Sequence, residues 1–123
     1  MIVIRVACDD EAFRAVVAEL LEHQRDMRVL RFTDVAHTPE RSESPDVVVF
    51  GVSPRDEVVE HVPEYQDMAS TGAAVVVFCT SPDQAADFAD LGAEYVVDTN
   101  EPARELAAAV RQAYWQRAGR TVH

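Results

Sequence analysis

Short apolar runs alternate along this chain with segments that have helical spacing. Residues 2–7, 46–52 and 73–79 are almost continuously apolar, which is typical of parallel strands covered on both faces. Weaker runs at 28–33 and 94–97 predict an edge strand and a short last strand. Residues 11–23, 81–91 and 100–117 repeat apolar positions at helical spacing. The pattern therefore predicts alternating strands and helices, which gives a parallel sheet with helices on both faces.

Several residues predict where the helices begin and end. Asp9 or Asp10 can cap the helix over 11–23, and Gly92 is expected to stop the helix over 81–91. Residues 55–70 look helical, but Pro63 is expected to break or kink that helix. Residues 34–45 are polar and hold two prolines, so a second helix should be short or missing.

Chain length and net charge limit the number of domains and the kinds of partner. The chain has 123 residues, so we expect one domain over 1–123. Its 22 acidic residues outnumber 11 arginines, and the net charge of −11 argues against direct binding to nucleic acid. We find neither a membrane-spanning run nor a signal-like segment, and expect a cytoplasmic protein. The two cysteines, Cys8 and Cys79, form no zinc motif.

Four segments in order resemble the receiver domains of two-component response regulators, the CheY-like superfamily. They are Cys-Asp-Asp-Glu-Ala-Phe-Arg from residue 8, Ser-Pro-Asp-Val-Val-Val-Phe from 44, Val-Val-Val-Phe-Cys-Thr-Ser from 75, and Leu-Gly-Ala-Glu-Tyr-Val-Val from 91. The resemblance covers essentially the whole chain. It implies a flavodoxin-like (βα)5 three-layer α/β sandwich, with a five-stranded parallel sheet in the order 2-1-3-4-5. It also places the family's switch pair on Thr80 and Tyr95.

Two departures from the family pattern bear on function. The phosphoacceptor aspartate of receivers ends the third strand, and here that position falls on Gly51, or on Phe50 in the alternative alignment. The family lysine after the fifth strand, which neutralises the phosphoryl charge, is replaced by Asp98. An anion there would repel a phosphoryl group. The resemblance is therefore to a pseudo-receiver.

The acidic residues at the strand ends leave an alternative open. Asp9 and Asp10 follow the first strand, and with Asp98 they offer the oxygen ligands that a cation such as Mg²⁺ prefers. Alternatively, Asp9 and Asp10 bind no metal and serve only to cap the helix over 11–23. The spacing alone favours this second interpretation. No other cofactor is expected, because the four glycines form no phosphate-binding loop.

The last helix offers a candidate interface. Its packing stripe includes Leu106, Val110 and Ala113, whereas Trp115 lies roughly opposite that stripe and near Arg111. Tryptophan and arginine are enriched at the centres of protein interfaces.

Three functions can be weighed against these features. We expect a non-phosphorylatable signalling or scaffold domain that acts through a protein partner or homodimerisation. The alternative is a binding module for a small ligand or divalent metal. Asp9 and Glu11 faintly resemble the acidic pair of haloacid dehalogenase-type phosphatases, but the later lysine and acid motifs are missing, so no enzyme is expected.

Overall fold

The computed structural model describes residues 2–8, 10–30, 45–53, 58–70, 73–98 and 102–121. These residues form five strands and four helices. In chain order they are β1 (Ile2–Ala7), α1 (Glu11–Glu22), β2 (Met27–Leu30), β3 (Val47–Gly51), α3 (Val58–Ser70), β4 (Ala74–Cys79), α4 (Pro82–Asp90), β5 (Tyr95–Asp98) and α5 (Pro102–Thr121).

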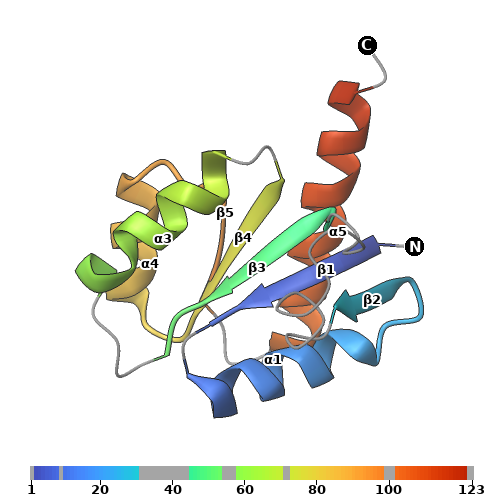
Figure 1. Cartoon of the computed structure of the whole chain (residues 1–123), viewed down its shortest axis with the longest axis horizontal. Helices are drawn as coiled ribbons and strands as arrows, with labels where there is room; N and C mark the ends of the chain where they lie inside the picture. The colour runs from blue at the N-terminus through green and yellow to red at the C-terminus, as the bar shows by residue number, and fades with distance from the viewer. Residues whose placement is uncertain are drawn as a thin grey trace.

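The strands form one parallel sheet in the order β2-β1-β3-β4-β5, as the sequence predicts. Figure 1 shows α1 and α5 on one face of this sheet and α3 and α4 on the other. The last turns of α5 extend past the end of the sheet at which β1 begins. The predicted flavodoxin-like fold is confirmed. The expected short or missing second helix falls almost entirely in residues 31–44, which lie outside the described residues.

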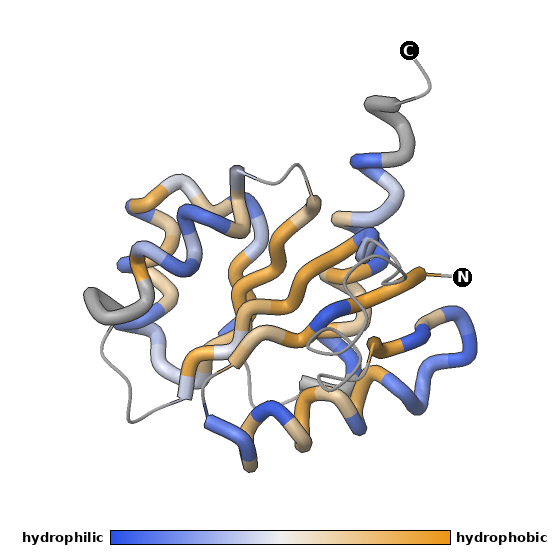
Figure 2. The backbone as a smooth tube through the Cα atoms, in the orientation of Figure 1, coloured by the Kyte–Doolittle hydropathy of each residue, from blue (hydrophilic) through white to orange (hydrophobic). Residues whose placement is uncertain are grey.

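The core has two halves because side chains alternate across the sheet. On the α1 and α5 side, buried residues include Ile4, Val49 and Val110. On the α3 and α4 side they include Phe50 and Phe88, whose rings meet edge to face at 5.9 Å. Figure 2 shows the same arrangement as apolar strands between helices of mixed polarity.

The ends of the helices follow the local chemistry that the sequence indicates. The Asp10 carboxylate accepts a hydrogen bond from the Phe13 N–H at 3.1 Å and caps α1. Gly92 follows α4 with a φ of 95°, the left-handed conformation that glycine adopts most readily. Ser81 stands at the start of α4 but makes no side-chain capping bond.

Two helices differ from expectation. Pro63 lies inside α3, and the helix continues through it. Because Pro63 falls in the second turn, it removes only one backbone hydrogen bond of that helix. The helix α5 runs to Thr121, beyond the expected end near residue 117. Across the described part of the chain, no helix has the length and apolarity needed to span a bilayer.

Candidate functional site at the carboxyl edge of the sheet

The positions assigned by the family resemblance meet at one edge of the sheet. Gly51 ends β3 opposite Phe78, and Asp98 ends β5 opposite Cys79. Thr80 directly follows β4 and is exposed. Asp46, in contrast, precedes β3 at the opposite edge, where its carboxylate accepts a hydrogen bond from the Val3 N–H at 3.0 Å. The edge that holds Gly51 is therefore the candidate site.

Gly51 is buried among apolar atoms. A Cβ placed on it would lie 3.4 Å from the Cys8 Cβ, 3.5 Å from the Cys8 Sγ and 3.5 Å from Cε1 of Phe13. The Phe13 ring also stacks on Phe78 at a centroid distance of 5.5 Å. One extra carbon fits against this wall in ordinary van der Waals contact. A carboxylate there would face a thiol and an aromatic ring, and would lose much of its hydration.

Asp98 gives the far side of this edge a negative charge. It is exposed at the end of β5 and lies beside the fully buried Cys79. Burial raises the pKa of the Cys79 thiol to about 11, and the Asp98 charge acts in the same direction. The structure thus places an anion where the family resemblance expects a lysine.

Of the acidic residues predicted at the strand ends, Asp10 and Asp98 are not brought together. Asp10 caps α1, and Asp9 lies outside the described residues. The end of β1 is three strand positions from the end of β5, which is about 14 Å at the usual spacing of parallel strands. One cation cannot bridge Asp10 and Asp98 over that distance. Within the ranges that the structure describes, no group of three or more histidine, cysteine or acidic side chains is placed to hold a metal ion.

The switch-like pair is also separated. Tyr95 begins β5 opposite Val76, whereas Thr80 lies four residues beyond Val76, about 13 Å further along the strand. The Tyr95 side chain packs on the α5 side of the core, and its hydroxyl donates a hydrogen bond to Oε1 of Gln116. Tyr95 is therefore tied to α5 and does not face Thr80.

The candidate interface residues on α5 have different environments. Trp115 is 66% exposed and contacts only the edge of the Tyr114 ring among the aromatic side chains described. Arg111 instead forms a two-pronged ion pair with Asp26, at 2.9 and 3.0 Å, and bonds Gln24 at 2.7 Å. Arg111 holds α5 to the turn before β2, whereas Trp115 stands on the surface as predicted.

Two residues at the site edge were not found from the sequence. The Arg14 guanidinium donates to the Cys8 carbonyl at 3.1 Å and places a cation beside the end of β1. The buried Gln84 amide donates to the Ser53 carbonyl at 3.1 Å and ties the first turn of α4 to the segment after β3. Arg14 could have been found from its position in the sequence, one helical turn after the capping residue Asp10. Gln84 had no sequence signal, because its partner is 31 residues away.

Comparisons with known proteins agree with this architecture. A response regulator receiver domain from Clostridium thermocellum superposes with a TM-score of 0.67 at 20% identity, covering 96% of this chain and 98% of that one. A pilus assembly-related protein of Burkholderia pseudomallei gives 0.67 at 21% identity, with 94% and 91% covered. A pilus assembly protein, CpaE, of Burkholderia thailandensis gives 0.67 at 20% identity, with 94% and 100% covered. No protein-family model and no curated protein matches the sequence.

The chain thus has the fold of response-regulator receiver domains. At these identities the likeness establishes the fold alone. What the chain does has to be argued from its own residues at the carboxyl edge and on the surface around α5.

Proposed function

We propose that this chain is a receiver-like signalling or scaffold domain that is not phosphorylated and binds a protein partner or a second copy of itself. It acts in the cytoplasm and catalyses no reaction. The observation that carries the proposal is the burial of Gly51 against Cys8 and Phe13 at the phosphoacceptor position. Glycine has no oxygen that could take up a phosphoryl group.

The charge at the end of β5 supports the same conclusion. Asp98 stands where the family lysine would neutralise a phosphoryl group. Two like charges at close range repel by roughly 1 to 4 kcal/mol, depending on the local dielectric. Loss of the nucleophile and reversal of the neighbouring charge act together against phosphotransfer.

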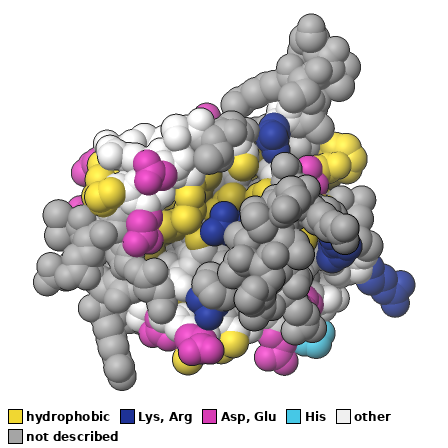
Figure 3. Space-filling model, viewed as in Figure 1, with side chains coloured by type: hydrophobic (Ala, Val, Ile, Leu, Met, Phe, Trp, Pro, Cys, Tyr) yellow, Lys and Arg dark blue, Asp and Glu magenta, His cyan; other side chains and the backbone are white. Residues whose placement is uncertain are grey.

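The surface formed by α4, β5 and α5 is the proposed contact site. The helix α4 carries Asp83, Asp87 and Asp90 and no basic residue, whereas the sequence of α5 holds four arginines and one acidic residue, Glu105. Two copies related by a two-fold axis can set the acidic helix of one against the basic helix of the other. Figure 3 shows one face of the molecule, with acidic side chains over α3 and along α1 at the lower rim.

The phosphorylation part of the proposal is tested with an acyl phosphate. The chain is incubated with acetyl phosphate and Mg²⁺ beside a phosphorylatable receiver domain, and both are measured by intact mass. We expect added phosphate on the second protein only. A stable adduct on this chain, lost on mild alkaline treatment as an aspartyl phosphate would be, contradicts the proposal.

The contact part is tested by sedimentation of the full chain, alone and with proteins co-purified from its host. Trp115→Ala is expected to weaken the complex at least tenfold, because an exposed tryptophan at a contact is often a hot spot. Val16→Ala is the matched control, since Val16 is 55% exposed on α1, which is not one of the three elements of the proposed surface. Equal effects of the two variants would refute the assignment of this surface.

A further inference from the structure

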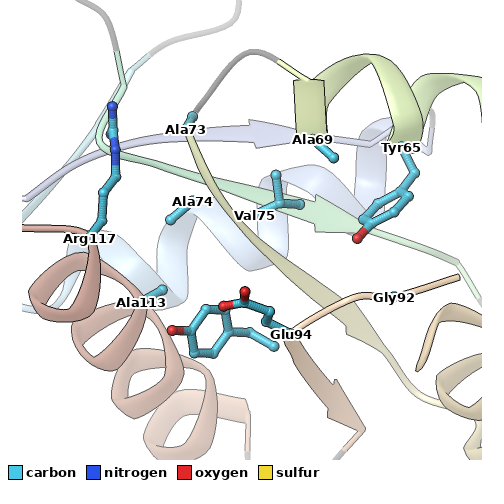
Figure 4. Close-up of a pocket in the computed structure, with 10 residues that line it drawn as sticks. Tyr65, Ala69, Ala73, Ala74, Val75, Gly92, Glu94, Ala113 and Arg117 are labelled. Carbon is cyan, nitrogen blue, oxygen red and sulfur yellow. The ribbon is translucent and has the colours of Figure 1, made fainter. Parts of the chain in front are cut away.

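A cavity of about 290 Å³ opens at the amino ends of β4 and β5, the edge of the sheet opposite Gly51. The helices α3 and α5 both contribute to its walls (Figure 4). Much of its lining consists of small residues from several elements, namely Ala69, Ala73, Ala74, Gly92 and Ala113. The cavity exists because larger side chains are missing from all of these positions at once.

The part of the cavity beside α3 is lined by residues without charge. Figure 4 shows the side chains of Tyr65, Ala69 and Val75 around one space, with Gly92 in the turn next to it. A Cβ placed on Gly92 would meet no atom within 4 Å, so the space is open on that side. Apart from the Tyr65 hydroxyl, the side chains of this part offer only apolar contacts.

The Tyr65 hydroxyl is a polar group that a ligand could pair. Tyr65 is only 7% exposed, and its ring is held edge to face against Phe50 and Phe88 at 6.2 and 5.6 Å. Figure 4 shows its hydroxyl pointing into the cavity. Among the described residues, this hydroxyl has no hydrogen-bond partner. Burial raises the pKa of the group, and the Glu94 charge raises it further, so it keeps its proton and can both donate and accept.

The two charged residues of the lining already have other interactions. Arg117 lies on the α5 side, where its Nη1 donates to the Asp46 carbonyl at 3.0 Å, and Figure 4 shows its side chain leading away from Glu94. Glu94 also has an interaction partner in the structure. A charged ligand beside α3 would therefore lose hydration without gaining a free partner of opposite charge. An uncharged ligand avoids that cost.

We propose that the α3 side of this cavity binds a small uncharged molecule with an apolar body and one hydroxyl group, about the size of phenol. The ligand hydroxyl pairs with that of Tyr65, and the apolar body packs on Ala69 and Val75. An apolar cavity of about 150 Å³ is large enough to hold benzene. The volume of this cavity lies near the lower end of the range for small-molecule sites, which excludes a nucleotide. Such binding goes beyond the proposed function, because it requires neither a protein partner nor the loss of phosphorylation.

The test is a titration of the ¹⁵N-labelled full chain, followed by amide chemical shifts. The probes are phenol and benzyl alcohol, with toluene as the match that lacks a hydroxyl and with benzoate and benzylammonium as charged matches. At least one hydroxyl probe is expected to give saturable shifts at Ala69, Val75 and Gly92. It should bind more tightly than toluene by about threefold to tenfold, the usual effect of one neutral hydrogen bond.

Both charged probes should bind more weakly than the hydroxyl probe, by about tenfold or more. Absence of saturation for both hydroxyl probes overturns the proposal. Equally tight binding of toluene or of a charged probe overturns it too, because the Tyr65 hydroxyl and the uncharged lining would then select nothing.

The variant Tyr65→Phe separates a binding role of the hydroxyl from a structural one. It keeps the ring that packs on Phe50 and Phe88, and it removes a hydroxyl without a partner among the described residues, so the fold should be kept. The hydroxyl probes should then bind no more tightly than toluene, whose own binding should not change. A preference for the hydroxyl probes that survives in Tyr65→Phe refutes the proposed pairing.

The variant Ala69→Leu tests the position of the site independently. It fills the cavity from an exposed position of α3 and leaves Tyr65 in place, so it should weaken binding of the hydroxyl probes by at least tenfold. Ala15→Leu makes the same change at an exposed position of α1 that does not line the cavity, and it should leave binding unchanged. Unchanged binding in Ala69→Leu refutes the site even if Tyr65→Phe folds poorly.

Discussion

Restoring an aspartate at the degenerate phosphoacceptor position should destabilise this protein in a pH-dependent way. Gly51 has no positive φ, so its backbone accepts any residue. A Cβ there meets Cys8 and Phe13 at 3.4 to 3.5 Å, which is ordinary contact. Gly51→Ala is therefore expected to change the free energy of unfolding by no more than about 1 kcal/mol. The further atoms of an aspartate side chain extend along the same apolar wall.

The size of the effect follows from the cost of burying a carboxylate. If burial raises the pKa of the carboxyl group introduced by Gly51→Asp by about two pH units, the folded state loses about 3 kcal/mol at pH 7.5. The penalty is absent below the unfolded-state pKa of about 3.9, and it grows by about 1.4 kcal/mol per pH unit until the folded-state pKa is reached. At pH 5 it should therefore be about 1.5 kcal/mol.

The assay is urea unfolding at pH 5 and pH 7.5, with Gly51→Asn as the matched control of the same shape and no charge. The free energy of unfolding of Gly51→Asp should be lower than that of Gly51→Asn by the amounts given above. This difference should grow as the pH rises. Adding Asp98→Lys should narrow the gap at pH 7.5 by about 1 kcal/mol, because a cation then stands two strands away. Equal stability of the Asp and Asn variants at both pH values would refute the description of Gly51 as facing an apolar wall.

Three further predictions concern other parts of the fold. Arg111 holds the pKa of Asp26 below its usual range, so Asp26→Asn should cost less than about 1 kcal/mol at pH 7 in this exposed pair, as measured by urea unfolding, and the cost should shrink as the pH falls through that lowered pKa. Cys79 is fully buried with a raised pKa, so iodoacetamide at pH 8 should modify only the half-buried Cys8 until urea is added; two native adducts by intact mass would contradict this. Gly92→Ala should lower the free energy of unfolding by about 1 kcal/mol because of the φ of 95°, and an unchanged urea midpoint would argue against that strain.

Local features of this fold were predictable because their causes lie close together in the sequence. The continuous apolar run that contains Val49 needs cover on both faces, and that need alone indicates a central parallel strand. Asp10 caps a helix that begins at the next residue, and Gly92 ends one that stops two residues earlier. The exposure of Trp115 follows from its angle on a helix whose packing side is already apolar.

The features that sequence reasoning missed depend on partners far apart in the chain. Arg111 was expected only as an interface residue, but Asp26, 85 positions earlier, turns it into a structural anchor. The cavity beside Arg117 arises from small residues on separate elements, each unremarkable by itself. Val16 is one of the apolar positions within the helical repeat of residues 11–23, yet the structure leaves it 55% exposed.

The two edges of the sheet are joined by one short strand. β5 begins with Tyr95 in the wall of the cavity and ends with Asp98 at the degenerate site, only four residues in all. The Asp98 end carries an anion beside the buried Cys79, whereas the Tyr95 end lines a cavity and has a hydrogen bond to α5. If this domain responds to a small molecule, the Tyr95 end of β5 is where the structure provides both space and a connection to the proposed contact surface.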